Sequence, residues 1–113
     1  MNQTEFNKYL RRDHGRCYHC GIQDDTLIPQ HRRGRGMGGS KSKSSNGAAN
    51  IITFCSAANQ LLEQDADFRF EAKRFGWSLE SWQSPDFEPV FDVSTSRWWI
   101  LENDGSRHPA IVE

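Results

Sequence analysis

The feature of this sequence that most constrains its fold is a pair of cysteines, Cys17 and Cys20, which stand three positions apart and precede Gly21. This spacing is typical of a knuckle that turns two thiolates toward one metal ion. Cys55 is the third cysteine, and an odd count argues against a disulfide framework. Only 35% of the 113 residues are hydrophobic, a low share for the core of a small domain. We therefore expect one domain, residues 1–113, that a metal ion or a partner helps to stabilise.

Neither a membrane span nor a secretory leader is predicted. No apolar run is long enough to cross a bilayer. The chain opens on the polar residues Met1 to Glu5, without the charged and then apolar pattern of a signal peptide. Thiols stay reduced inside cells, which agrees with metal ligation or burial of the cysteines. These features predict a cytoplasmic protein with no membrane partner.

The charge of the chain is unevenly distributed. Its formal net charge is -1, but residues 1–43 carry nine basic and four acidic side chains, and residues 44–113 carry five basic and eleven acidic ones. The first part therefore has a balance of +5 and the second of -6. Such asymmetry points to a surface that faces a polyanion, although a solvated face explains charge alone equally well.

Periodicity and turn residues predict an α+β chain with an N-terminal helix and a C-terminal β-hairpin. The expected elements are a helix over 4–13, strands over 27–31 and 50–55, helices from Ser56 and over 67–75, and a hairpin over 89–93 and 97–101. Between the first two strands lies a loop rich in Arg, Lys, Gly and Ser. Its cations could neutralise phosphates, while a solvated loop is the alternative. The candidate DNA contacts are Arg32, Arg33, Arg35, Lys41 and Lys43.

Three stretches after the cysteine pair resemble the HNH endonucleases, most closely the small HNH proteins of actinobacterial phages. The stretches are Gln30-His31-Arg32-Arg33-Gly34-Arg35-Gly36-Met37-Gly38-Gly39-Ser40, Ala49-Asn50-Ile51-Ile52 and Cys55-Ser56-Ala57-Ala58-Asn59. The resemblance covers about residues 16–63. It implies a ββα-metal (His-Me finger) core there, with residues 64–113 as an extension.

The resemblance also implies an activity: metal-dependent hydrolysis of DNA, by nicking or double-strand cutting, with a link to a phage terminase or another packaging protein. His31 matches the general base, and Asn50 the residue that orients the His31 loop or ring through hydrogen bonds. Asn59 matches a ligand of the catalytic Mg²⁺ or Mn²⁺, as in H-N-N variants. Gln30 stands where the family usually has an acidic or histidine ligand. With both positions neutral, metal binding without DNA should be weak.

Many HNH proteins also hold a structural zinc between two cysteine pairs. Here Cys17, Cys20 and Cys55 match three ligands, and Ala58 occupies the fourth position. Zinc would need His14 or His19 as a substitute. Alternatively no zinc binds, and Cys55 is a small buried apolar residue.

Two other functions remain open. The neutral metal site and the acidic C-terminal part favour a catalytically silent HNH-fold module that binds DNA or a packaging protein. A zinc-stabilised interaction domain with no nucleic-acid role is a weaker alternative. Four tryptophans are expected in core and edge packing rather than on bases, because acidic residues surround them. They are Trp77, Trp82, Trp98 and Trp99.

Overall fold

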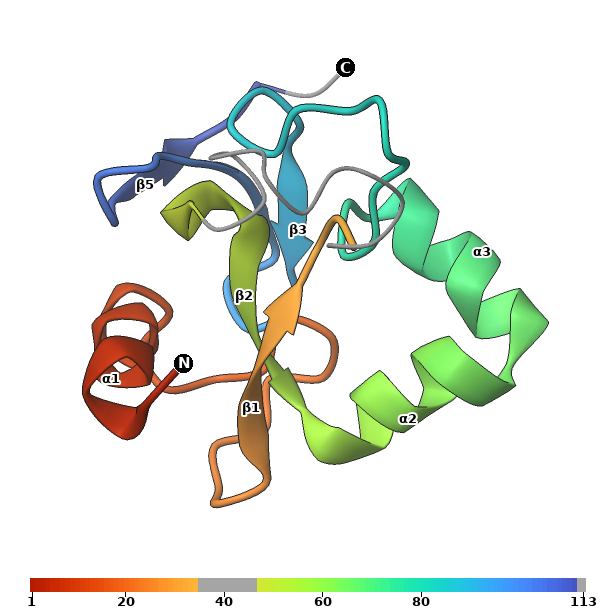
Figure 1. Cartoon of the computed structure of the whole chain (residues 1–113), viewed down its shortest axis with the longest axis horizontal. Coiled ribbons are helices and arrows are strands. Elements are labelled where there is room, and N and C mark those ends of the chain that lie inside the picture. The colour runs from red at the N-terminus through yellow and green to blue at the C-terminus, as the bar shows by residue number, and fades with distance from the viewer. Residues whose placement is uncertain (35–46, 112–113) are drawn as a thin grey trace.

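A computed structural model of the chain describes residues 1–34 and 47–111 and has an α+β fold (Figure 1). Arg35, Lys41 and Lys43, three of the predicted DNA contacts, lie outside the described residues. The elements in chain order are α1 (Gln3–Arg12), β1 (Leu27–His31), η3 (Ala48–Asn50), β2 (Ile51–Cys55), α2 (Ser56–Gln64), α3 (Ala66–Arg74), β3 (Val90–Asp92), β4 (Arg97–Leu101) and β5 (Arg107–Pro109).

Helix α1 begins and ends at residues with clear local causes. The Asn2 side chain caps its first turn by accepting a hydrogen bond from the Glu5 amide at 2.9 Å. The helix ends before His14 and Gly15, whose backbone φ angles are +57° and +65°. Its buried Phe6 faces the rest of the molecule, as the predicted amphipathic pattern requires.

Strands β1 and β2 pair antiparallel and lead directly into α2. The register runs from Leu27 opposite Cys55 to His31 opposite Ile51. All five residues of β2 are buried, because α1 and α2 both contact this strand. In Figure 1 these two helices lie on opposite sides of the β1–β2 pair. The strand, strand, helix order of the sequence prediction is therefore present.

The C-terminal part forms a three-stranded antiparallel sheet in the order β3-β4-β5. The predicted hairpin corresponds to β3 and β4, where Phe91 pairs with Trp98. The sequence analysis did not include β5, which follows the Asp104-Gly105 turn and pairs with β4 from Trp99 to Leu101. A short strand of this kind depends on its partner for its hydrogen bonds, so its own sequence carries little signal.

Aromatic rings fill the core between the two sheets and α3. Trp77 is 2% exposed, packs edge-on to Phe54 and donates its Nε1–H to the Phe91 carbonyl at 2.8 Å. Trp98 and Trp99 are half-buried, as expected for edge packing. Trp82 contradicts the prediction of packing, because 78% of it is exposed. Among the described residues, no helix is both long enough and apolar enough to cross a membrane.

Candidate metal centre and active site

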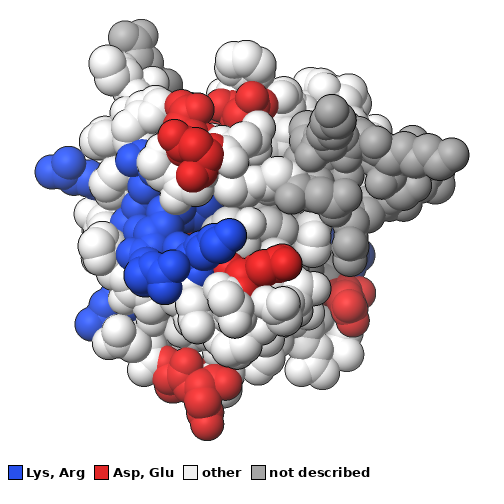
Figure 2. All heavy atoms as spheres, turned by 60° about the vertical axis from the view of Figure 1, so that its left-hand side comes forward, with Lys and Arg blue, Asp and Glu red and all other residues white. Residues whose placement is uncertain are grey.

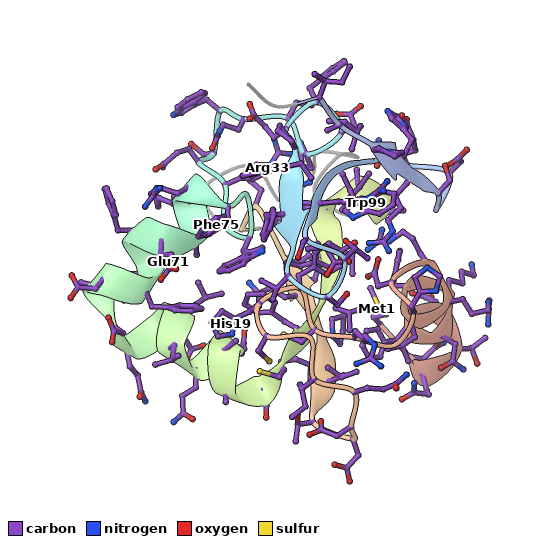
Figure 3. All side chains as sticks on the ribbon, turned by 180° about the vertical axis from the view of Figure 1, so that it is seen from behind. Met1, His19, Arg33, Glu71, Phe75 and Trp99 are labelled. Carbon is purple, nitrogen blue, oxygen red and sulfur yellow. The ribbon has the colours of Figure 1, made fainter. Side chains whose placement is uncertain are left out.

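Four side chains come together where the cysteine knuckle meets the end of β2. The ligand atoms of Cys17, His19, Cys20 and Cys55 all lie within 4.8 Å of one another. The Cys20 and Cys55 sulfurs are 3.9 Å apart. Figure 3 shows His19 beside α2 and α3, with sulfur atoms next to it. This group can hold a metal ion.

Backbone amides point at two of the sulfurs. Cys17 Sγ accepts from the amides of His19 at 3.3 Å and Cys55 at 3.2 Å. Cys55 Sγ accepts from Ala58 at 3.3 Å and so caps the N-terminus of α2. Burial raises the pKa of Cys17 to about 12, against the opposing effect of these amides. A bound cation would supply the charge that a buried thiolate needs.

His19 completes the set. Its Nδ1 is the one buried side-chain nitrogen or oxygen in the described part of the chain that has no hydrogen-bond partner. Phe68 and Trp77 pack against the ring edge-on, with centroids 5.0 and 5.3 Å away. Burial lowers the pKa of His19, which favours the neutral imidazole that ligates metals. The other candidate, His14, is exposed and lies outside the group. Three sulfurs and one imidazole nitrogen fit a tetrahedral zinc ion.

The predicted catalytic histidine stands next to a tightly held segment. His31 is the last residue of β1 and is half-buried. Asn50, fully buried, accepts from the Arg33 amide at 2.7 Å and donates to the Arg33 carbonyl at 3.0 Å. The Arg32 amide also donates to the Asn50 carbonyl at 2.8 Å. Asn50 thus fixes the backbone that directly follows His31.

The predicted ligands of a catalytic cation are both amides. Gln30 donates its Nε2–H to the His31 carbonyl at 2.8 Å, so part of its amide is already engaged. Asn59 is half-buried in the second turn of α2. Among the described residues, the Cys/His group is the only cluster of three or more His, Cys, Asp or Glu side chains that could hold a metal. A hard cation near Asn59 would therefore depend on oxygens of the substrate and of water.

Arg32 corrects a prediction of phosphate contact. The side chain is 1% exposed, and all five of its N–H groups meet backbone carbonyls. The acceptors are Gly76 at 2.8 Å, Ala49 at 3.0 Å, Pro85 at 2.8 Å, Glu88 at 2.8 Å and Pro89 at 3.5 Å. Burial lowers the pKa of Arg32 to about 10, which still leaves it charged at neutral pH. Arg32 therefore links β1 to the C-terminal part and is not available to DNA.

Arg33, the neighbouring candidate DNA contact, is half-buried. Its Nη1 donates to the Gln83 carbonyl at 3.0 Å. Figure 3 labels this side chain near the end of α3 and the loop that follows. Its guanidinium is thus partly committed to a contact within the protein, and phosphate binding by Arg33 stays a prediction.

A buried polar network was not found from the sequence. Asp13, fully buried, accepts from Arg12 Nε at 2.7 Å, Tyr18 Oη at 2.6 Å and Thr53 Oγ1 at 2.8 Å. Although burial lowers it, the pKa of Arg12 is raised overall because Asp13 bonds to it and attracts it. Arg107 from β5 reaches the same carboxylate at 4.0 Å. Arg12 and Tyr18 lie close to Asp13 in the sequence, but Thr53 and Arg107 come from distant parts of the chain, so no local pattern marks the network.

Comparison with models of known protein families, with curated proteins and with solved structures finds no match for this chain.

Proposed function

We propose that this protein is an HNH-type endonuclease that hydrolyses DNA phosphodiester bonds with the help of a divalent metal ion. The observation that carries the proposal is the double hydrogen bond between Asn50 and the Arg33 backbone, next to His31. The HNH resemblance calls for a histidine at the end of the first strand and an orienting asparagine in the second; here His31 ends β1, and Asn50 ends η3 directly before β2. The strand, strand, helix order is in keeping with it.

In the proposed reaction His31 is the general base. Its imidazole takes a proton from water as the water oxygen attacks phosphorus and the bond to the leaving oxygen breaks. Asn50 contributes indirectly by holding the backbone after His31 in one conformation. A Mg²⁺ or Mn²⁺ ion near Asn59 would offset negative charge on the scissile phosphate. A role beside a DNA-packaging terminase belongs to the same proposal.

We further propose that the Cys/His group binds structural zinc through Cys17, His19, Cys20 and Cys55. Support comes from the four donors within 4.8 Å and from the unpartnered His19 Nδ1. Because Cys55 is also the N-cap of α2, zinc would fix the start of the helix that carries Asn59. A closed site with four protein ligands suits a structural ion rather than a catalytic one.

Nicking of supercoiled plasmid tests the proposed activity. Wild-type protein is incubated with Mg²⁺, with Mn²⁺ or without added metal, beside His31→Ala and the matched variant His14→Ala, whose side chain is exposed. Wild type and His14→Ala should nick with one of the metals. His31→Ala should be slower by at least about 10²-fold, the lower range for loss of a general base. Equal rates for His31→Ala and wild type would refute the role of His31.

Binding separates the other two interpretations. A wild-type protein that binds DNA but nicks it with neither metal would be the silent HNH-fold module. That alternative has specific support, since the predicted metal position offers only the amides of Gln30 and Asn59. A protein that neither nicks nor binds DNA, yet binds zinc, would be the interaction domain.

A further inference from the structure

Exposed cations gather on the side of the molecule formed by α1. Lys8 and Arg11 lie on α1, Arg16 precedes the cysteine knuckle, and Arg97 begins β4. All four are exposed, and none forms an ion pair with a described residue. Figure 2, which brings this side forward, shows Lys and Arg side chains grouped between acidic patches above and below. We call these four residues the α1 cationic face.

Contacts beneath this surface connect Arg16 and Arg97 to the C-terminal end of α1. Arg107 forms an ion pair with Asp92 at 2.9 Å, approaches Asp13 at 4.0 Å and lies 4.0 Å over the Trp99 ring. Arg97 is two residues before Trp99 on β4, so both side chains project to the same face of the strand. Arg16 donates to the Gly21 carbonyl at 3.0 Å, and Gly21 packs against Ser94 of the turn that leads to β4.

The buried network does not neutralise the exposed cations. Arg12 pairs with Asp13 and Arg107 with Asp92, so these two arginines and two aspartates balance each other. Arg11, in the last turn of α1, also interacts favourably with the helix dipole. That effect does not explain Arg16 or Arg97, which lie outside the helix. The remaining positive charge faces solvent.

We propose that the α1 cationic face binds the sugar-phosphate backbone of double-stranded DNA, as a second contact apart from His31. Three of its four members are arginines, whose planar guanidinium groups bind phosphate oxygens in pairs. The choice of DNA as the polyanion rests on the proposed function.

The α1 cationic face is also rigidly joined to the candidate active site. Arg12 donates to the Ala48 carbonyl at 3.0 Å and the Ile51 carbonyl at 2.6 Å, on either side of the Asn50 segment. DNA held on α1 is therefore held at a fixed position relative to Asn50. The surface orients the duplex and reads no base sequence.

Salt-dependent DNA binding tests the surface. The test variant is Arg11→Gln/Arg97→Gln, and the control is Arg69→Gln/Arg74→Gln on α3, which removes the same charge from exposed positions. Lys8 is not substituted, because it lines a pocket that Asp104 also lines. Both variants are made in a full-length His31→Ala chain so that no DNA is cut. Fluorescence anisotropy with a labelled duplex gives Kd between about 50 and 300 mM salt, a range over which the Debye length falls about 2.4-fold.

The test variant should lower the slope of log Kd against log salt by about 1.8, since each lost phosphate contact removes about 0.9. The control should keep the slope of the His31→Ala parent. Equal slopes in the two variants, or binding to anionic vesicles in place of DNA, would overturn the proposal. If wild-type protein fails to nick plasmid while the two variants differ in slope as expected, the nuclease proposal fails and the DNA-binding surface stands. If it nicks plasmid while the slopes are equal, the surface fails and the nuclease proposal stands.

Discussion

Replacing Arg32 by methionine should destabilise this protein severely. The guanidinium is 1% exposed and donates to five backbone carbonyls, four of them at 3.0 Å or less. Each hydrogen bond from a charged donor contributes about 1.5–3 kcal/mol to stability. The loss of four such bonds is partly offset, because Arg32→Met also removes the cost of burying a charge, which is several kcal/mol. We expect a net loss of about 3–5 kcal/mol in the free energy of unfolding, the usual result of breaking a buried charged network. For a domain of this size that is roughly 12–20 °C in Tm.

Chemical denaturation followed by far-ultraviolet circular dichroism measures this loss. Arg97→Gln is the control, because its exposed side chain should change stability by no more than about 0.5 kcal/mol. Arg32→Lys should also be costly, since an ammonium offers three donors to carbonyls that now receive five. A stable Arg32→Met protein that had lost DNA binding would refute the reasoning and return Arg32 to the DNA surface.

Three further predictions concern the metal group, the polar network and the tryptophans. His19→Ala should abolish tight binding of one Zn²⁺ per chain, while His14→Ala should keep it. Zinc titration and the visible spectrum of the Co²⁺ form measure this binding. Equal zinc affinities of the two variants would show that His19 is not a ligand. Asp13→Asn should lower the free energy of unfolding by about 3 kcal/mol, because an amide N–H would replace a carboxylate oxygen that accepts hydrogen bonds. An unchanged urea midpoint would contradict this prediction. In the same assay, Trp77→Ala should lower the free energy of unfolding by about 3–5 kcal/mol and Trp82→Ala by under about 0.5 kcal/mol. Equal losses of stability would show that Trp82 is not exposed in solution.

Local patterns were sufficient for most elements of the N-terminal part. The β1 strand matches its predicted range, and α1 begins and ends one residue before the predicted helix over 4–13. The cap of α2 is an instructive exception, because Ser56 is the usual residue type for this role. The structure uses the Cys55 sulfur, which accepts from the Ala58 amide. Cys55 also belongs to the Cys/His group, so this cap could not be inferred from the residues of α2 alone.

The role of an arginine could not be predicted from its neighbours. Arg32 lies in a basic, glycine-rich stretch that is typical of phosphate contacts, yet its acceptors are 17 to 57 residues away in the sequence. The two candidate histidine ligands present the same problem, since spacing allowed either. Packing by Phe68 and Trp77 half-buries His19, whereas His14 is exposed. Burial by long-range partners decides both cases.

The charge asymmetry of the chain takes on a different meaning once burial is known. Of the six basic residues that the structure describes in positions 1–43, Arg12 and Arg32 are buried and bind groups of the protein itself. Arg32 binds carbonyls between Gly76 and Pro89, and the network of Arg12 extends through Asp13 to Arg107 of β5. The basic and acidic parts are therefore joined through their interiors. Positive charge available to DNA in the described residues is carried instead by exposed positions such as Arg11, whose removal leaves the buried links intact.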